Sequence, residues 1–202
     1  WWTCENIRRT ARRRFLLMSE KYKASGVLFS TPFWHYRTPP QEGAVKWALE
    51  YEKANPESAV ISNLGGYQSI SNEDFTVIPF FDQIQDSLKT LPTFTYGNWW
   101  LNINRKDHYN ITHTHPSSDL SAVYSITDNN GTLILINPLF HNHHPIERFC
   151  EWEDNELFSN TSRMTTIAGD LLVFPAHVPH RVNPNLTNTP RISLAFNLKF
   201  LD

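Results

Sequence analysis

Residues 94–126 have the sequence FTYGNWWLNINRKDHYNITHTHPSSDLSAVYSI, in which runs of β-branched and aromatic residues alternate with clusters of Asn, Asp, Ser and Pro. This alternation is typical of short β-strands joined by turns. The pattern continues to the end of the chain. It predicts strands over 94–104, 110–115, 120–126, 131–137, 163–167, 170–174, 179–183 and 191–199. Eight short strands at this spacing predict a double-stranded β-helix, that is, a jelly-roll or cupin-like barrel.

The part of the chain before this region has a different character. Helix formers predict a helix over about 41–54, after Pro39-Pro40, and another over about 80–88. We therefore expect a mostly β fold with N-terminal helices. The expected organisation is a basic N-terminal extension over 1–25 and a single domain over 26–202, with helical support over about 40–90 and the jelly-roll core over about 93–200.

Composition gives no support to some classes of partner. The net charge of -2 and the pI of about 6.5 give no bulk attraction to nucleic acid or to anionic membranes. No apolar run reaches the roughly 18 residues of a membrane span, so we expect a cytoplasmic protein with its two cysteines reduced. Arginines at 8, 9, 12, 13 and 14 fit a solvated segment, with a nucleic-acid-binding arm as the alternative. The sequence leaves the oligomeric state open.

The histidines are grouped. His113 and His115 lie two apart in a predicted strand, where both side chains point to one face. The segment FPAHVPHRV carries His177 and His180 just after the apolar strand DLLVF, and it could supply a third ligand. Imidazole suits Fe, Zn, Cu and Ni, and three protein ligands leave positions open for catalysis. An isolated His-x-His also occurs in ordinary strands. His141, His143 and His144 fit an exposed loop, and His35 and His108 structural roles.

The last predicted strand, RISLAFNLKF, alternates strictly and places Arg191 and Ser193 on its less apolar face. A guanidinium beside a hydroxyl could bind one end of a dicarboxylate, although Arg191 could instead make a surface ion pair. Asn102 and Asn104 share a face of an earlier strand and could orient a carboxylate or water, or cap a turn. Ser121 and Tyr124 are weaker candidates, because their spacing points them to opposite faces.

With these motifs in place, the segment from Phe94 to Leu198 resembles the 2-oxoglutarate- and Fe(II)-dependent oxygenases, in particular a group common in marine phages and bacteria. The resemblance is carried by WWLNINRKDHYNITHTHPSSDLSAVYS, GTLILINP, AGDLLVFPAHVPHRV and PRISLAFN, and upstream by VLFSTPFW and SNLGGYQS. It implies the cofactor Fe(II), the cosubstrate 2-oxoglutarate, O2 and an unidentified prime substrate. It also implies hydroxylase-type chemistry that releases succinate and CO2, in the host cytoplasm if the chain is phage-encoded.

The resemblance assigns roles to individual residues. It makes His113 the first metal ligand, His115 the second and His180 the distal one, and it gives Arg191 with Ser193 the far carboxylate of 2-oxoglutarate. No catalytic residue is implied beyond the metal centre. The second ligand is usually an aspartate in the wider superfamily, so His115 is a departure that adds one positive charge to the centre, and Asp119 is the alternative carboxylate ligand.

Two other functions remain open at this point. One is a three-histidine, cupin-type dioxygenase that does not use 2-oxoglutarate. The other is a non-catalytic jelly-roll module that binds a partner or builds a particle. Arg191 with Ser193 argues against the first alternative, because a dioxygenase that acts directly on its substrate does not need a group that binds a dicarboxylate. The second alternative predicts no bound iron, so metal analysis of the purified protein would separate it.

Overall fold

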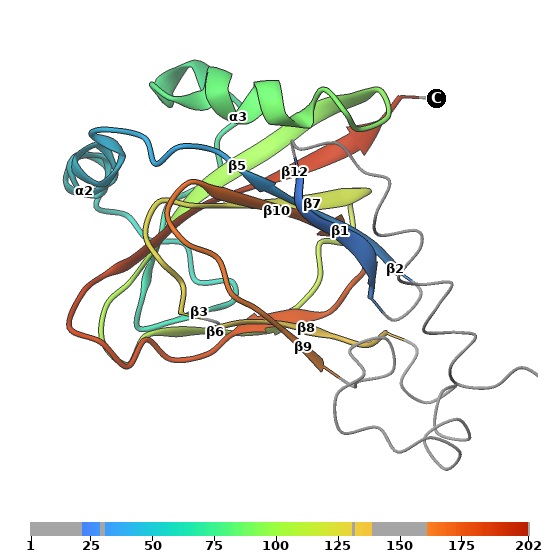
Figure 1. Ribbon diagram of the computed structural model, residues 1–202. Coiled ribbons are helices and arrows are strands. Elements are labelled where there is room, and N and C mark those ends of the chain that lie inside the picture. Colours follow the sequence, from blue (N-terminus) through green and yellow to red (C-terminus); the bar gives the residue numbers. More distant parts are fainter. Residues whose placement is uncertain (1–21, 29–30, 131, 139–160, 202) are drawn as a thin grey trace, which may run out of the picture.

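The computed structural model describes residues 22–28, 31–130, 132–138 and 161–201, which form two facing β-sheets (Figure 1). The larger sheet has the strand order β1-β2-β10-β7-β12-β5-β4, and the smaller has β3-β6-β11-β8-β9. The strands are β1 (Tyr22–Leu28), β2 (Thr31–Arg37), β3 (Asn63–Leu64), β4 (Tyr67–Gln68), β5 (Phe94–Asn104), β6 (Tyr109–His113), β7 (Leu120–Ser125), β8 (Leu133–Ile136), β9 (Thr161–Met164), β10 (Asp170–Pro175), β11 (His180–Val182) and β12 (Arg191–Phe200).

The eight strands predicted from Phe94 onward are β5 to β12, so the mostly β jelly-roll fold is confirmed. Both predicted helices are also present, as α2 (Ala44–Ala54) and α3 (Phe81–Leu88), and a short 3-10 helix, η1 (Phe75–Val77), precedes α3. Residues 1–21, which include the arginine cluster, lie outside the described residues. The same holds for His141, His143 and His144.

The hairpin of β1 and β2 was not predicted as strands. It extends the larger sheet at one edge, where β2 pairs antiparallel with β10 from Trp34↔Val173 to Arg37↔Asp170. Trp34 and Tyr36 pack in the main core, whereas His35 and Arg37 point to the other side of the strand. Pro32 weakened the strand signal of this segment, because proline has no backbone N–H to donate to the ladder.

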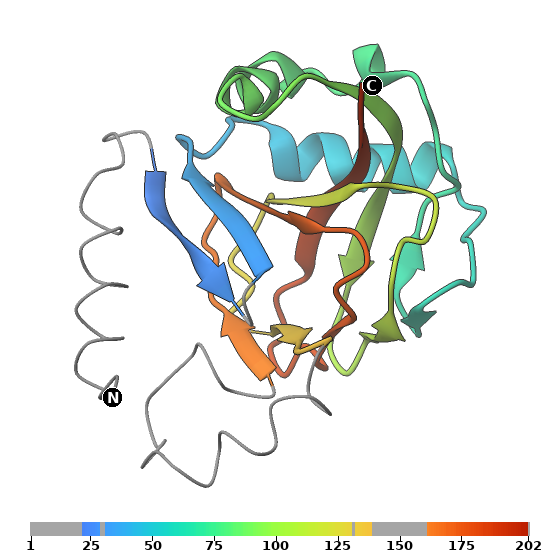
Figure 2. The same cartoon turned by 90° about the vertical axis from the view of Figure 1, so that its right-hand side faces the viewer.

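The main core lies between the larger sheet and the helices, which cover its outer face (Figures 1 and 2). Ile84 and Leu88 of α3 and Leu194 and Phe196 of β12 are all 0% exposed in this layer. Side chains alternate across a strand, so burying these β12 residues turns Arg191 and its same-face neighbours toward the space between the two sheets. The helices thus determine which face of β12 is left for chemistry.

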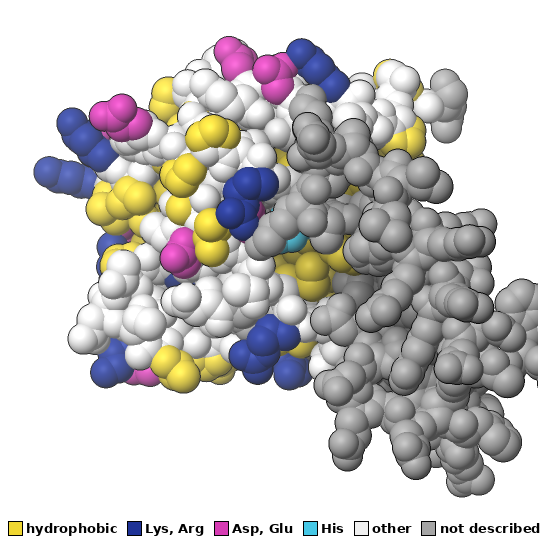
Figure 3. Space-filling view, in the orientation of Figure 1, with side chains coloured by type: hydrophobic (Ala, Val, Ile, Leu, Met, Phe, Trp, Pro, Cys, Tyr) yellow, Lys and Arg dark blue, Asp and Glu magenta, His cyan; other side chains and the backbone are white. Residues whose placement is uncertain are grey.

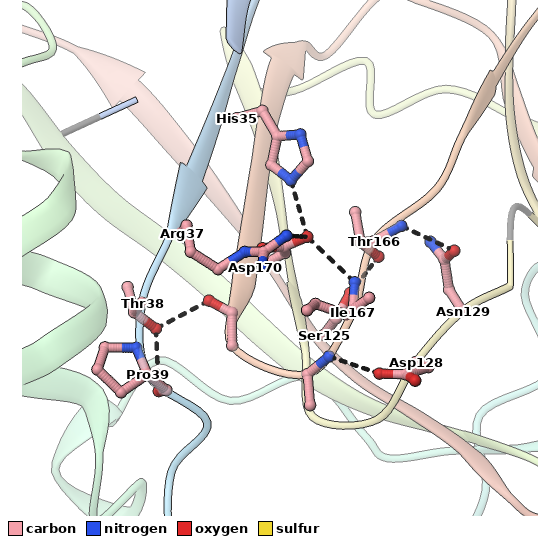
Figure 4. A network of polar contacts seen from close by, with 12 residues as sticks. His35, Arg37, Thr38, Pro39, Ser125, Asp128, Asn129, Thr166, Ile167 and Asp170 are labelled. Atoms are coloured by element: carbon pink, nitrogen blue, oxygen red, sulfur yellow. Dashed lines mark hydrogen bonds and ion pairs between the residues drawn. The ribbon is translucent and has the colours of Figure 1, made fainter. Parts of the chain in front are cut away.

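A buried carboxylate fastens β2 to β10 (Figure 4). Asp170 is 0% exposed and accepts hydrogen bonds from Arg37 Nε, from Arg37 Nη2 at 3.2 Å and from Ile167 N at 3.1 Å, and His35 Nε2 lies 2.9 Å from its Oδ2. Burial by itself would raise the pKa of Asp170, but these hydrogen bonds lower it below the ordinary value. The carboxylate is therefore ionised at neutral pH.

We expect Asp170→Asn to lower the free energy of unfolding at pH 7 by about 2 kcal/mol, because an amide NH2 replaces one of the two buried oxygens that accept from Arg37 and Ile167 N. In the wild type, a lowered Asp pKa stabilises the fold above the ordinary Asp value, and this stabilisation is lost as the pH falls through the folded-state value. Urea unfolding at neutral and acidic pH measures both effects. The exposed Asp128, changed to Asn, is the control, and equal losses in the two variants would contradict the prediction.

The described surface shows no concentration of charge of one sign on the face drawn in Figure 3, where acidic and basic side chains are interspersed. Such a face lacks the broad basic area that a phosphate backbone requires. Among the residues that the structure describes, no helix combines the length and the apolar character needed to cross a membrane.

Candidate metal centre

Two of the predicted histidines are cross-strand partners. His113 is the last residue of β6 and His180 the first of β11, and they face each other in the antiparallel ladder with ring centroids 4.2 Å apart. His115 continues on the same face after β6 ends, where its backbone N–H bonds to Ala176 O at 2.9 Å. Its ring lies 5.3 Å from that of His113 and 5.1 Å from that of His180. The fold thus brings all three imidazoles together.

Each of the three rings uses Nδ1 in a hydrogen bond to an oxygen. His113 Nδ1 bonds to Ile111 O at 2.7 Å, His180 Nδ1 to Val178 O at 3.0 Å, and His115 Nδ1 to the side-chain Oδ1 of Asn197 at 2.8 Å. A carbonyl oxygen only accepts, so Nδ1 carries the proton in every ring and Nε2 keeps its lone pair. Nε2 is then the atom available to a metal ion.

Burial makes these rings neutral. It lowers the pKa of His113 and of His115, and with the nearby His113 it lowers the pKa of His180 to about 3. The potential ligand atoms of the three residues lie within 4.8 Å of one another, and His115 Nε2 is buried without a hydrogen-bond partner. Three neutral imidazoles converging in this way fit a first-row transition metal such as Fe(II).

An inner cavity between the sheets is lined by the three histidines and by Arg191. Antiparallel pairing sets Arg191 beside Asn104 and Ser193 beside Asn102, so these four predicted residues form one polar patch on the cavity face of β12 and β5. Ser121 of β7 also lines this cavity. The strands therefore assemble the five residues in one place.

Arg191 is a buried cation without a counter-charge among the described residues. Its side chain donates from Nη1 to Asn183 O at 3.0 Å, whereas Nη2 is buried without a partner. Burial lowers the pKa of Arg191 to about 10, which still leaves it charged at physiological pH. Side-chain oxygens of Asn102, Asn104 and Ser121 are likewise buried and unpaired. Buried polar groups of this kind normally have partners, so the cavity has the properties of an anion site.

Hydrogen bonds behind the patch fix one of its amides. Asn104 Nδ2 donates to Asn110 Oδ1 at 2.9 Å, and Asn110 Nδ2 donates to Ser62 Oγ at 3.2 Å. Asn104 Oδ1 is left without a hydrogen-bond partner and lies against Gly66. The supporting roles of Asn110 and Ser62 could not be predicted, because the residues come from separate loops and strands that only the fold brings together.

Two predicted site residues lie elsewhere. Tyr124 points into the main core, where its ring centroid is 5.8 Å from that of Phe80. Asp119 is exposed outside the histidine group, and its carboxylate accepts from Phe200 N at 2.8 Å. His177, the other histidine of its segment, is also exposed.

A second, outer cleft opens on the opposite side of the histidines. It shares Ser62, Trp100, His113 and His115 with the inner cavity. Farther out its walls are mainly hydroxyl and amide side chains, with one acidic and one basic residue; they include Gln68, Ser71, Glu73, Asn98, Ser117, Ser118, Asn197 and Lys199. His113 and His115 thus line both the inner cavity that contains Arg191 and the polar outer cleft.

Comparison with known proteins agrees with this geometry. Residues 98–197 match the family model described as "Putative 2OG-Fe(II) oxygenase", and this segment contains all three histidines and Arg191. A search of curated proteins gives no match.

Solved structures share the fold at low sequence identity. The carbocyclase SnoK from nogalamycin biosynthesis, described as non-heme and α-ketoglutarate-dependent, has a TM-score of 0.60 at 12% identity over 85% of this chain and 81% of its own. HygX from Streptomyces hygroscopicus, solved with nickel, 2-oxoglutarate and hygromycin B, has 0.57 at 10% over 84% and 83%. A Pseudomonas putida prolyl-4-hydroxylase has 0.54 at 14% over 86% and 95%.

These structures establish the barrel, and the family match covers the strands that carry the histidine group and the anion site. The cofactor and cosubstrate of the family, Fe(II) and 2-oxoglutarate, are those that the sequence predicted. The chain belongs to the 2-oxoglutarate- and Fe(II)-dependent oxygenases.

Proposed function

We propose that this oxygenase hydroxylates a substrate that reaches the metal through the outer cleft, with His113, His115 and His180 as the iron ligands. Turnover would convert 2-oxoglutarate and O2 to succinate and CO2 and add one oxygen atom to the substrate. The observation that carries the proposal is that Arg191, with its buried and unpaired Nη2, lines the same cavity as three converging imidazoles.

In this proposal the inner cavity holds 2-oxoglutarate. Arg191 donates to its distal carboxylate, Ser193 adds a hydroxyl, and the amides of Asn102 and Asn104 orient the bound acid. The patch lies on adjacent antiparallel strands, so its geometry is rigid before the cosubstrate arrives, and little entropy is lost on binding. Bound Fe(II) supplies the oxygen chemistry.

Three neutral imidazole ligands do not offset the charge of a divalent metal ion, so any balancing negative charge must come from the molecules that bind to the ion. With the distal carboxylate paired to Arg191, only the metal-binding end of the cosubstrate is left to offset the charge of the ion, so a centre of three imidazoles would keep one positive charge where a centre with one carboxylate ligand would be neutral. We therefore expect His115 to favour the binding of anions at the metal.

The test is a turnover assay on the purified full chain with Fe(II), ascorbate, air and 2-oxoglutarate, in which succinate is quantified. We expect slow succinate formation without added substrate, abolished by a chelator and accelerated by a true substrate. Iron-loaded protein that neither binds nor consumes 2-oxoglutarate would overturn the proposal. His177→Ala serves as the control variant, because it removes an exposed histidine outside the centre and should retain full activity.

A further inference from the structure

The three histidines are not supported in the same way. His113 and His180 each bond through Nδ1 to the main-chain carbonyl two residues earlier in their own segments. His115 bonds instead to a side chain on the other sheet, Asn197 of β12, which is 82 residues away in sequence. Its ring orientation therefore depends on a contact that crosses the site.

The amide of Asn197 is itself held in one orientation. Its Nδ2 donates to Asn98 Oδ1 at 2.9 Å, which turns its Oδ1 toward His115 Nδ1 at 2.8 Å. A rotated Asn197 amide would set its NH2 against the ring nitrogen, and Asn98 would have to rotate as well to keep a hydrogen bond with it. In the observed arrangement of the two hydrogen bonds, Nδ1 of His115 carries the proton.

An irregularity in the larger sheet makes this arrangement possible. Phe196 pairs with Trp99 and Leu198 with Tyr96, so Gly97 and Asn98 together oppose the single residue Asn197 in a β-bulge. A Cβ added at Gly97 would lie 3.3 Å from Asn197 O and 3.5 Å from Asn197 Cβ, a tight fit. Bulges redirect side chains next to functional sites, and here the bulge presents Asn98 to Asn197.

We propose that Asn197, oriented by Asn98, is a positioning residue that fixes the tautomer and ring orientation of His115 for metal binding. The inference rests on the proposed function, because it takes His115 as a ligand. The cross-sheet acceptor keeps Nε2 of His115 unprotonated and near the ligand atoms of the other two imidazoles.

Packing offers a competing explanation, since the Trp100 ring lies 5.2 Å from that of His115 and could hold it by contact alone. Two substitutions separate the explanations. Asn197→Leu keeps a similar volume but removes the acceptor. Asn197→Asp keeps an acceptor oxygen for His115, and the amide of Asn98 can rotate to donate to it.

The first measurement uses the metal-free full chain. Long-range ¹H–¹⁵N correlation NMR distinguishes the two neutral imidazole tautomers, and the His115 signals are identified by their loss in His115→Gln. We expect the Nδ1–H form in the wild type and in Asn197→Asp, and a mixture of both forms in Asn197→Leu. Retention of the pure Nδ1–H form in Asn197→Leu would overturn the inference.

The second measurement is the affinity for Co(II), a probe that air does not oxidise readily. Substitutions of residues that support metal ligands cost about 10- to 100-fold in affinity, and we expect a loss in this range for Asn197→Leu. Asn197→Asp should bind Co(II) at least as tightly as the wild type, and Asn98→Ala should fall between the wild type and Asn197→Leu. Asn55→Leu, at the end of α2, is the control for the loss of an amide away from the site.

The outcomes separate this inference from the proposed function. If the wild type binds Co(II) and Asn197→Leu binds it equally well, only the role of Asn197 is refuted. If Asn197→Asp loses as much affinity for Co(II) as Asn197→Leu does, an acceptor oxygen at position 197 is not what supports His115, and the inference is refuted. A wild type that binds no Co(II) would overturn the metal centre and this inference with it.

Discussion

A His180→Ala variant is expected to lose more than ~100-fold in metal affinity, because even residues that only support a ligand contribute 10- to 100-fold. His180 is the most enclosed of the three rings, with Phe174 at 5.0 Å and His113 at 4.2 Å between ring centroids. Removing it takes away the distal ligand and leaves two imidazoles from one strand segment. Isothermal titration with Co(II), and succinate formation under Fe(II), should both report the loss.

Stability has to be measured alongside, since the Ala variant also creates a cavity. His180→Gln fills more of the space and is expected to unfold close to the wild-type temperature without metal while binding metal poorly. The His177→Ala control should match the wild type in both respects. Metal affinity that is unchanged in both His180 variants would show that the ligand set is wrong.

Arg191→Met is expected to leave metal affinity unchanged and to weaken 2-oxoglutarate binding by about 2 kcal/mol or more, close to 30-fold. Charge-assisted, bidentate hydrogen bonds to a carboxylate contribute this much when they are buried. Met fills most of the volume of the arginine stem without charge. The metal-free variant should therefore be no less stable than the wild type, because a buried cation without a counter-charge is unfavourable until an anion binds.

The matched control is Arg181→Met, which removes an exposed arginine of β11 whose Nε bonds only weakly to Asn183 Oδ1 at 3.3 Å. Binding of 2-oxoglutarate to the metal-loaded chain, followed by calorimetry, should be unaffected by that change. If Arg191→Met bound 2-oxoglutarate as tightly as the wild type, the carboxylate site would have to lie elsewhere in the molecule.

Strand periodicity was sufficient to predict much of this molecule. Alternation in RISLAFNLKF set Arg191 and Ser193 on one face, and the structure has them lining the cavity with Asn102 and Asn104. The same parity argument separated Ser121 from Tyr124, and only Ser121 reaches the cavity. The alternation of residue types predicts these positions because side chains alternate between the two faces of a strand, and burial of one face fixes which residues point to it.

What could not be predicted depends on contacts between distant segments. The role of Asn197 depends on a one-residue irregularity between β5 and β12, and sequence alternation does not register such a bulge. The hairpin of β1 and β2 depends on Asp170, more than 130 residues away, for its polar anchor. Asp119 looked like a ligand by its spacing from His115, yet the turn after Pro116 takes it to the sheet edge beside Phe200.

The spacing of side chains along β12 also bears on which keto diacids can bind as the cosubstrate. Along its cavity face it carries Arg191 and Ser193 beside the inner cavity, Asn197 beside His115 and Lys199 beside the outer cleft. Successive same-face residues are separated by about 6.6 Å, so the strand holds the guanidinium of Arg191 at a fixed distance from Asn197, which contacts His115. If Arg191 and the histidines bind the two ends of 2-oxoglutarate as proposed, we expect a keto diacid one methylene shorter or longer to bind more weakly.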